Sequence, residues 1–458
     1  MVVENPLDGV AARLEAELDS FVRLQHVAGA VAGVVLEDQL AWTAGCGFAD
    51  LASGRRPDAG TLHMIGSVTK TFTGTAVMQL RDRGLLDLDD PVSRHLPELA
   101  ERDAAGLSAV TIRRLLSHES GLMGDPPGSD WATGSFDDVA AALVRRDEIA
   151  ASIPPNTQTK YSNLGYQLLG EVVTRVSGTP YTQYVKREIL DPLGMSSTSF
   201  APEDDLAARC AVGYGPATFS DDLTPASLLQ DLAAPGGLWS TVEDLSRWLG
   251  LQFRAARGAP GEPGGAQVLR AATLAEMHAA RYLSNATWTE AFGITWYSTR
   301  KGETVWVGHG GHVDGFMTYA GFLPDKKLGV IVLVNGVADP TDVALGLGEI
   351  ALEVVRPSSV SPPAPAPREA RDLLGIYFCE RHGELVRVEW REGTLKLVYP
   401  DNPDPDPTLS QAGEPDVFLV HTGRDAGEAA VFLRAADGRV RGVRIAAVTY
   451  SRLAPVAE

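Results

Sequence analysis

A proline-rich stretch at residues 357–367 divides this chain more sharply than any other feature of its sequence. It reads Pro-Ser-Ser-Val-Ser-Pro-Pro-Ala-Pro-Ala-Pro. Proline fixes φ and lacks an N–H group, so such a run stays extended and forms neither a helix nor a central strand. It also has no residues from which a core could form. The sequence therefore predicts two separate domains, at residues 1–356 and 368–458, joined by a stiff linker at 357–367.

The composition is that of an ordinary globular protein, and it excludes several kinds of partner. Of the 458 residues, 44% are hydrophobic and 22% are charged,. A formal net charge of -19 argues against nucleic acids and anionic membranes, which are bound through Lys and Arg,. No apolar run reaches the roughly 18 residues of a membrane span. Cys46, Cys210 and Cys379 are scattered, which predicts buried free thiols rather than disulfides or metal ligands,.

The N-terminal segment lacks the features of a secretion signal. Glu4 and Asp8 stand where a signal peptide has basic residues, and no apolar stretch follows them,. Apolar residues at helical spacing instead predict an amphipathic helix, formed around Leu7, Val10, Leu14, Leu18 and Phe21,. We therefore expect a cytoplasmic protein, although an exported protein whose leader had been removed would have the same sequence.

Hydrophobic periodicity predicts strands at both ends of the first domain and helices between them. Residues 298–301 are expected to form a turn at a strand end. The expected elements are a hairpin at 31–36 and 40–48, helices from about 71 to 251, strands at 292–297, 305–308, 316–323 and 328–335, and a last helix at 342–355.

Beyond the linker the pattern is that of strands alone. Residues 385–389 and 394–398 are expected to pair with each other, as are 431–434 and 440–448,. Short strands over roughly ninety residues predict a closed or nearly closed β-barrel.

Ser67-Val68-Thr69-Lys70 places a hydroxyl and an amine three residues apart. It follows Gly66 and begins a segment with helical spacing of apolar residues,. Residues three apart share a helix face, so the amine of Lys70 is expected to lie beside the hydroxyl of Ser67. A serine becomes a nucleophile when a base stands next to it, and a partly desolvated lysine is such a base. Alone this pattern is weak, because Ser298 and Lys301 have the same spacing.

Two further motifs support it. Tyr161-Ser162-Asn163 precedes an amphipathic run, so its phenol and amide are expected to point into one cleft. His309-Gly310-Gly311 is expected at the end of a strand, where two glycines let a substrate backbone approach closely,.

The order Ser-x-x-Lys, Tyr-x-Asn, His-Gly-Gly resembles the penicillin-recognising serine hydrolases: class C β-lactamases, D-alanyl-D-alanine carboxypeptidases, D-aminopeptidases and related esterases. The resemblance covers roughly residues 10 to 355 and extends to the segments 115–122, 236–241 and 333–336. The segment 115–122 is expected to be structural.

The resemblance implies an α/β (α+β) fold, an antiparallel sheet flanked by helices with a helical insertion. Residues 374–377 resemble the start of the lipocalin-like C-terminal domains of some members.

The resemblance also implies roles for individual residues. Ser67 would attack a carbonyl carbon, with Lys70 and Tyr161 sharing the role of proton acceptor; which of them is the base stays open. The backbone N–H groups of Ser67 and His312 would stabilise the oxyanion. Asn163 would hold the substrate amide. His309, with Gly310 and Gly311 beside it, would meet a substrate carboxylate or another polar group where class C β-lactamases have lysine.

The substrate expected is a small molecule or short peptide, most of all a D-amino-acid peptide or amide, and no cofactor is expected. A carboxylesterase or a weak β-lactamase is the alternative. The histidine departs from the lactamase pattern and lowers the expectation of β-lactam hydrolysis. A non-catalytic penicillin-binding protein is a further alternative, which Ser67, Lys70 and Tyr161 argue against.

Structural interpretations compete with these roles. Ser67 could cap a helix, Tyr161 could be a packing phenol, and Asn163 could be a helix N-cap. His309, with His312 and Asp314, superficially suggests a metal cluster. However, this spacing lacks the helical geometry of a zinc protease, so no metal is expected,. No Gly-x-Ser-x-Gly occurs, which excludes the nucleophile elbow of an α/β-hydrolase,.

Overall fold

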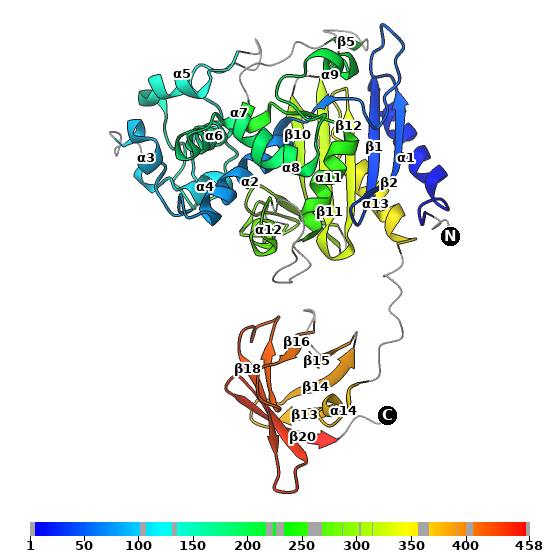
Figure 1. The fold of residues 1–458 in the computed structure, drawn as a ribbon, viewed down its shortest axis with the longest axis vertical. Helices are drawn as coiled ribbons and strands as arrows, with labels where there is room; N and C mark the ends of the chain where they lie inside the picture. Colours follow the sequence, from blue (N-terminus) through cyan, green and yellow to red (C-terminus); the bar gives the residue numbers. More distant parts are fainter. Residues whose placement is uncertain are drawn as a thin grey trace. The chain divides into compact units, whose positions relative to one another are not determined.

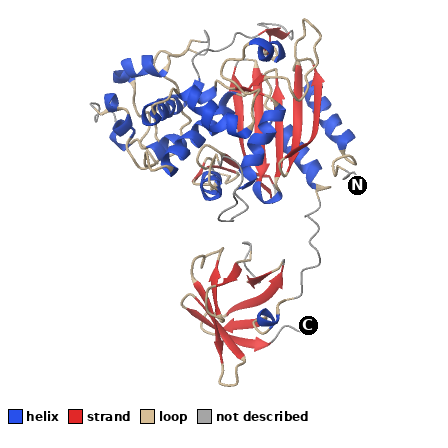
Figure 2. Cartoon of the chain, viewed as in Figure 1, coloured by secondary structure: helices blue, strands red, loops and turns tan. Residues whose placement is uncertain are grey.

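The computed structural model of the chain describes residues 5–100, 107–130, 135–216, 223–225, 233–254, 268–285, 287–301, 304–313, 315–355, 366–391, 393–399 and 406–454. Contacts among residues divide the chain into two units, Met1–Val355 and Arg356–Glu458. The first unit combines a sheet with helices, and the second is a β-barrel (Figures 1 and 2). Most of the predicted linker, 357–365, lies outside the described residues, so its extended form stays a prediction.

The first unit is built on an antiparallel sheet in which the two ends of its sequence meet. β1 (Gly29–Leu36) pairs with β2 (Gln39–Gly47) on one side and with β12 (Leu328–Val334) on the other. The sheet has eight strands in the order β2-β1-β12-β11-β10-β9-β8-β7. The remaining strands are β7 (Tyr282–Leu283), β8 (Glu290–Phe292), β9 (Tyr297–Lys301), β10 (Thr304–Val313) and β11 (Phe316–Leu323).

Helices cover both faces of this sheet, which explains why β12 is apolar throughout. Every residue of β12 is buried. Val332 packs into the core formed with α1 (Ala11–Leu24) and α13 (Thr341–Leu352). Leu333 packs into the opposite core, with α11 (Val242–Gln252). Each such burial stabilises the fold by about 1.5–3 kcal/mol.

Between β2 and β7 the chain forms the helical part, grouped around α2 (Thr69–Asp82). This helix is buried from Thr69 to Leu80. The hydroxyls of Thr71, Thr73 and Thr75 donate to backbone carbonyls, as Thr71 does to Val68 at 2.7 Å,. The other helices are α3 (Val92–His95), α4 (Ile112–Leu116), α5 (Val139–Val144), α6 (Asn163–Ser177), α7 (Tyr181–Val185), α8 (Asp191–Leu193), α9 (Asp204–Arg209), α10 (Ala233–Gly236) and α12 (Ala271–His278). Two small ribbons accompany them, β3 (His63–Met64) with β6 (Trp239–Ser240) and β4 (Tyr214–Pro216) with β5 (Leu223–Pro225).

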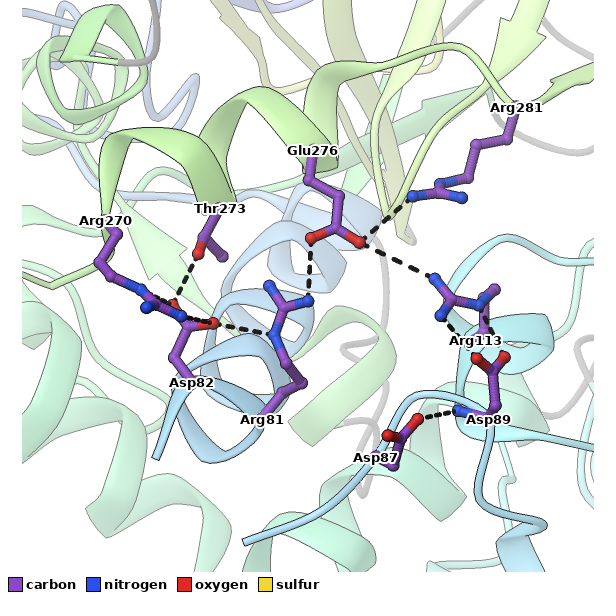
Figure 3. A network of polar contacts seen from close by, with 9 residues as sticks. All are labelled: Arg81, Asp82, Asp87, Asp89, Arg113, Arg270, Thr273, Glu276 and Arg281. Atoms are coloured by element: carbon purple, nitrogen blue, oxygen red, sulfur yellow. Dashed lines mark hydrogen bonds and ion pairs between the residues drawn. The ribbon is translucent and has the colours of Figure 1, made fainter. Parts of the chain in front are cut away.

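An ion-pair network ties the end of α2 to α4 and α12 (Figure 3). Glu276 of α12 is shared: Arg81 approaches one carboxylate oxygen at 2.9 Å, and Arg281 approaches the other at 3.3 Å. Arg113 of α4 lies 3.8 Å from Glu276 and bonds to Asp89 at 2.8 Å. Single exposed ion pairs contribute little, but a network with shared carboxylates fixes how these helices meet.

The second unit is a closed antiparallel barrel of eight strands. Its last strand pairs back to its first, with Tyr377 opposite Arg452. Inward-facing apolar side chains such as Val386, Val388 and Phe432 fill it. The barrel elements are α14 (Arg368–Arg371), β13 (Gly375–Cys379), β14 (Glu384–Arg391), β15 (Thr394–Val398), β16 (Thr408–Gln411), β17 (Val417–Val420), β18 (Ala429–Arg434), β19 (Val440–Ile445) and β20 (Val448–Ala454).

Several predicted strands differ from those observed. Residues 292–297 mostly connect β8 to β9, with Thr295 in the left-handed region at φ 69°. Residues 298–301, expected to form a turn, are part of β9. The predicted strand 440–448 is interrupted after Ile445, where Ala446 has φ 49°, and β20 begins at Val448.

The predicted fold class is confirmed, including the antiparallel sheet, the helical insertion and the barrel. Within the described residues, no helix is both long enough and apolar enough to cross a membrane. Cys46, Cys210 and Cys379 are free thiols, as predicted, but only Cys379 of the three is buried, whereas Cys46 and Cys210 are half-buried.

Candidate active site

Ser67 lies at the entrance to the buried helix α2, where the backbone turns tightly. Residues Gly66–Val68 form one 3-10 turn before α2, and Gly66 has φ +50°. A β-carbon on Gly66 would lie 2.7 Å from the backbone nitrogen of His312, so only glycine lets β10 come this close,. The positive end of the α2 dipole favours negative charge developing at this place.

Lys70 is buried among three oxygen atoms. Its Nζ lies 3.1 Å from Ser67 Oγ, 2.7 Å from Asn163 Oδ1 and 2.8 Å from the carbonyl oxygen of Pro235. Burial lowers the pKa of Lys70 well below its usual range, and the Asp125 carboxylate opposes this only partly,. Nζ donates hydrogen bonds to Asn163 Oδ1 and to the Pro235 carbonyl oxygen, and its third partner is the Ser67 hydroxyl.

Tyr161 packs between the same groups. Its ring stacks on that of His118, with the centroids 4.2 Å apart, and Lys70 Nζ lies 4.7 Å from its centroid. Burial raises the pKa of Tyr161, and a hydrogen bond with Ser67 opposes this in part. Tyr161 is therefore a neutral phenol at neutral pH.

His118 supports this tyrosine from a segment that was expected to be structural. It is buried, with φ 58°, and its Nδ1 accepts a hydrogen bond from the backbone nitrogen of Ser162 at 3.2 Å. Burial lowers the pKa of His118, and Lys70 and His309 lower it further. A neutral His118 thus anchors the loop that carries Tyr161.

Asn163 is the first residue of α6, and its side chain reaches the site because Ser162 caps the helix instead. Ser162 Oγ accepts from the backbone nitrogen of Gly165 at 3.0 Å. Asn163 Oδ1 accepts from Lys70, and its Nδ2 donates to Asp125 Oδ1 at 2.8 Å. The amide has two N–H donors, so Asp125 occupies only one of them. The interpretation of Asn163 as the helix cap is wrong.

The outer edge of β10 is open beside Ser67. β9 pairs with β10 from Thr304 to Gly308, whereas β11 pairs with it as far as Val313. Among the strands that the structure describes, none covers the outer edge of residues 309–313. An open strand edge can bind an extended ligand through main-chain hydrogen bonds. His309-Gly310-Gly311 therefore lies within a strand, and the expectation that it follows a strand end is wrong.

Gly310 and Gly311 differ in how much room they have. A β-carbon on Gly311 would lie 2.0 Å from the carbonyl oxygen of Ile65 and 2.4 Å from Thr318 Oγ1. On Gly310 the nearest atom would be Thr318 O at 3.7 Å, an ordinary contact. Glycine at 311 thus lets β10 pack against the turn that carries Ser67.

His309 is buried on β10, with its ring edge-on to Tyr297 at 4.9 Å. Its Nδ1 lies 2.5 Å from the carbonyl oxygen of Gly310, which assigns the ring proton to Nδ1 and makes Nε2 an acceptor,. Nε2 has no hydrogen-bond partner among the described residues. Burial lowers the pKa of His309 to about 3, with Lys70 contributing, so the ring is neutral.

The predicted residues surround one cavity of about 500 Å³, a size usual for small-molecule sites,. All of them line it except Lys70, which is buried. The lining comprises Ser67, Tyr161, Asn163, Glu290, Tyr297, Thr299, Gly308, His309, Gly310, Gly311, His312, Met317, Thr318, Tyr319, Asp339 and Thr341.

Sequence reasoning missed Asp125, Tyr297, Glu290 and Asp339. None belongs to a motif with spacing of its own, and only the tertiary fold brings them to the site. His118 had a signal, because it lies inside the segment 115–122 that carried the resemblance.

Within the described residues, no group of three or more His, Cys, Asp or Glu side chains is placed to hold a metal ion. His312 is exposed at the cavity, and Asp314 lies outside the described residues. The expectation that the site uses no metal stays a prediction.

A serine beside a buried lysine and a tyrosine, next to an open strand edge, defines a class of serine hydrolases. The comparisons with known proteins agree: the family model for beta-lactamase matches residues 13–354. The chain belongs to this family of β-lactamase-related serine hydrolases and penicillin-binding protein homologues, and it carries an eight-stranded C-terminal barrel.

Individual relatives extend this finding. Penicillin-binding protein 4 of Amycolatopsis lactamdurans is 31% identical over 81% of this chain and 98% of its own length. The solved structure of an octameric penicillin-binding protein homologue from Pyrococcus abyssi covers 96% of this chain and 99% of its own, with TM-score 0.64 and 23% identity. The solved structure of a class C beta-lactamase covers 76% of this chain and 98% of its own, with TM-score 0.63 and 19% identity. The two structural likenesses show the fold alone.

Proposed function

We propose that the protein hydrolyses amide or ester bonds through an acyl-enzyme on Ser67, and that its substrates are D-amino-acid peptides or amides. The observation that carries the chemistry is the 3.1 Å contact between Lys70 Nζ and Ser67 Oγ. The other two partners of Lys70 are carbonyl oxygens, which leaves the lone pair of a neutral amine for the serine proton.

Acylation follows from this arrangement. Ser67 Oγ attacks the substrate carbonyl carbon while its proton passes to Lys70, because burial lowers the pKa of Lys70 and so favours the amine that can accept a proton, whereas burial raises the pKa of Tyr161 and keeps it a phenol. The backbone N–H groups of Ser67 and His312 bind the oxyanion; losing one such donor typically costs about 3 kcal/mol. Tyr161 then passes a proton to the leaving group and regains one from the Lys70 ammonium.

Deacylation uses the same groups, with water in place of the serine as the nucleophile. Lys70 or Tyr161 takes a proton from a water molecule as its oxygen attacks the acyl carbon. The ester bond to Ser67 breaks, and the serine oxygen recovers a proton. Asn163 holds the substrate amide through the N–H that Asp125 does not use. No cofactor takes part in this scheme.

The substrate class rests on the histidine at position 309. A lysine there would offer a fixed cation to a substrate carboxylate, whereas His309 is neutral. We therefore expect D-amino-acid amides and small esters to be cleaved with higher kcat/KM than penicillins or cephalosporins. A carboxylesterase is the second candidate, because the open edge of β10 would accept either an amide or an ester. A cephalosporin turned over faster than every ester and D-amino-acid derivative would make the protein a β-lactamase instead.

Covalent labelling tests the nucleophile directly. The full-length protein is incubated with a fluorophosphonate, and separately with a β-lactam, and the intact mass and the labelled peptide are determined. We expect one adduct, on Ser67. Ser67→Ala is the control for reaction elsewhere. Absence of any adduct in a folded sample, together with absence of hydrolysis of p-nitrophenyl acetate, would favour a non-catalytic binding protein.

A further inference from the structure

A second pocket, of about 330 Å³, lies between α4 and the loop that leads to Tyr161. Its wall includes three arginines and two carboxylates: Arg113, Arg114, Arg281, Asp89 and Glu119. None of them is among the described residues that line the cavity beside Ser67. This pocket therefore has no part in the catalytic roles assigned above.

Arg114 is held in the pocket wall by neutral groups. Its Nε donates to Asn156 Oδ1 at 3.0 Å, and its guanidinium also donates to the carbonyl oxygen of Ala109. These bonds leave the positive charge of Arg114 uncompensated. A guanidinium has five N–H groups, so Arg114 also keeps donors for a ligand.

The other two arginines bond to carboxylates. Arg113 donates to both oxygens of Asp89, at 2.8 and 2.9 Å. Arg281 Nη2 lies 3.3 Å from Glu276, a carboxylate that also pairs with Arg81 (Figure 3). Because only one nitrogen of Arg281 takes part in this pair, its remaining N–H groups can serve a ligand.

The charges of all three arginines act on one place in the pocket wall. The hydrogen bond from Arg113 lowers the pKa of Asp89, burial opposes this, and the charges of the three arginines lower it further,. Glu119, the other carboxylate of the wall, accepts a hydrogen bond from the Ser117 hydroxyl at 2.5 Å. An anion that entered the pocket would be attracted by the same three cations.

The pocket also includes part of the loop that carries Tyr161. Asn156 lines it, and since its Oδ1 already accepts a hydrogen bond, its amide N–H groups face a ligand as donors,. The backbone nitrogen of Asn156 donates to the carbonyl oxygen of Glu119 at 3.0 Å, and that of Lys160 donates to the carbonyl oxygen of His118 at 2.8 Å. A ligand bound to Asn156 would therefore restrain the stretch that ends at Tyr161.

We propose that this pocket binds a small oxyanion, a phosphate or a carboxylate, between Arg114, Arg281 and Asn156, and that the bound anion restrains the loop that carries Tyr161. Guanidinium groups suit such ligands, because their N–H groups form a fixed fork that matches two oxygen atoms of a carboxylate or a phosphate. The site does not depend on the acyl-enzyme function of Ser67, so its occupation can be measured on Ser67→Ala as well.

Calorimetric titration with inorganic phosphate tests the site on the full-length protein, with the ionic strength held constant by sodium chloride. We expect one phosphate per chain with a Kd of about 1 mM, since partly exposed ion pairs are individually weak. Arg114→Gln and Arg281→Gln should each weaken binding about fivefold or more, because each removes a charged donor. Arg23→Gln, an exposed arginine of α1, is the matched control and should bind phosphate as the wild type does.

A parallel titration with acetate distinguishes the two kinds of ligand. Tighter binding of phosphate than of acetate would assign the site to phosphate, and the reverse order would assign it to a carboxylate. Either result supports an oxyanion site.

Hydrogen–deuterium exchange tests the link to the loop. The amides of Asn156 and Lys160 are hydrogen-bonded to backbone carbonyls, so phosphate should slow their exchange about threefold or more,. In Arg281→Gln, which changes no residue of the loop, phosphate should no longer have this effect.

Binding that does not saturate, or that is unchanged in Arg114→Gln and Arg281→Gln, would overturn the site. If Arg114→Gln does not fold, Arg281→Gln alone decides. Saturable binding without slower exchange of the two amides would overturn the restraint on the loop. Failure of the acyl-enzyme proposal would leave phosphate binding unaffected, because Ser67 has no part in this pocket.

Discussion

Burial acts in opposite directions on Lys70 and Tyr161, because the charged form is the protonated one in lysine and the deprotonated one in tyrosine. The pKa of Lys70 is lowered and that of Tyr161 is raised. Burial therefore favours the amine form of Lys70 and the phenol form of Tyr161, which supports Lys70 as the acceptor of the Ser67 proton in the proposed mechanism.

Ser67→Ala should abolish hydrolysis while leaving the fold intact. We expect kcat to fall by about 10⁴-fold or more, because residues that act as one unit lose most of the rate when any is removed. The melting temperature should change little, because one hydroxyl at a helix start contributes little to stability. Hydrolysis of p-nitrophenyl acetate and thermal unfolding are the measurements. A near-wild-type rate of hydrolysis by pure Ser67→Ala would refute the assignment of Ser67 as the nucleophile.

The pH dependence should follow Lys70. The reaction needs the neutral amine, so kcat/KM should rise with pH through the pKa of Lys70 and then level off. Since burial lowers this pKa, the plateau should begin at lower pH than an ordinary lysine would allow. The Asp125 charge raises the same pKa, so Asp125→Asn should move the rising limb to lower pH. Asp8→Asn, an exposed carboxylate, should not move it. If the rising limb of Asp125→Asn stays in place or moves to higher pH, Lys70 is not the group whose deprotonation the reaction needs.

At the scale of elements, the site depends on how closely β10 approaches the turn before α2. The strand keeps its partner β11 as far as Val313 but loses β9 after Gly308. One edge of the same strand is therefore held in the sheet while the other faces Ser67.

Gly311→Ala should damage the site, because the added β-carbon would meet the Ile65 carbonyl oxygen at 2.0 Å. The backbone must shift to relieve this contact, and we expect at least about 100-fold slower acylation by a fluorophosphonate, since a shift of about 1 Å can cost that much. Gly310→Ala is the matched control, because its nearest contact is 3.7 Å. It should keep the wild-type melting temperature. If Gly311→Ala and Gly310→Ala slow acylation equally, the close contact at Gly311 is not what positions Ser67.

The spacing of three residues predicted that Ser67 and Lys70 lie together, and the resemblance to the penicillin-recognising hydrolases implied that Tyr161 and Asn163 join them. The sequence did not predict that β10 runs through His309. Two glycines in a row suggest a strand end, and only pairing with β11 shows otherwise,. Asp125 could not be predicted, since its contact with Asn163 depends on the packing of a loop against α6. Long-range packing decides such positions.

At the scale of the whole molecule, each unit has a core of its own. Among the described residues, the buried core of the barrel comprises residues from Ala370 onward, with Ala366 of the linker packed against it. The cores next to β12 comprise, within the same described ranges, residues of the first unit.

A fragment of residues 1–356 should therefore fold alone. We expect it to be soluble, to unfold cooperatively and to acylate Ser67 with a fluorophosphonate at a rate within about threefold of the full chain, since domains with separate cores generally fold as units. Circular dichroism on heating and labelling rates are the measurements. Aggregation of the fragment would show that the two units share buried surface.

The pairing of β1 with β12 has a consequence for how the protein is made. Ala30 lies opposite Val334, so the middle of the sheet cannot close until nearly the whole first unit has been synthesised. At about 5–20 residues per second, β1 waits roughly 15–60 s for its partner. Its apolar residues, such as Val31 and Val34, would be uncovered on one strand edge during that time. The nascent chain therefore has a long interval in which chaperones, rather than its own fold, must protect this strand from aggregation.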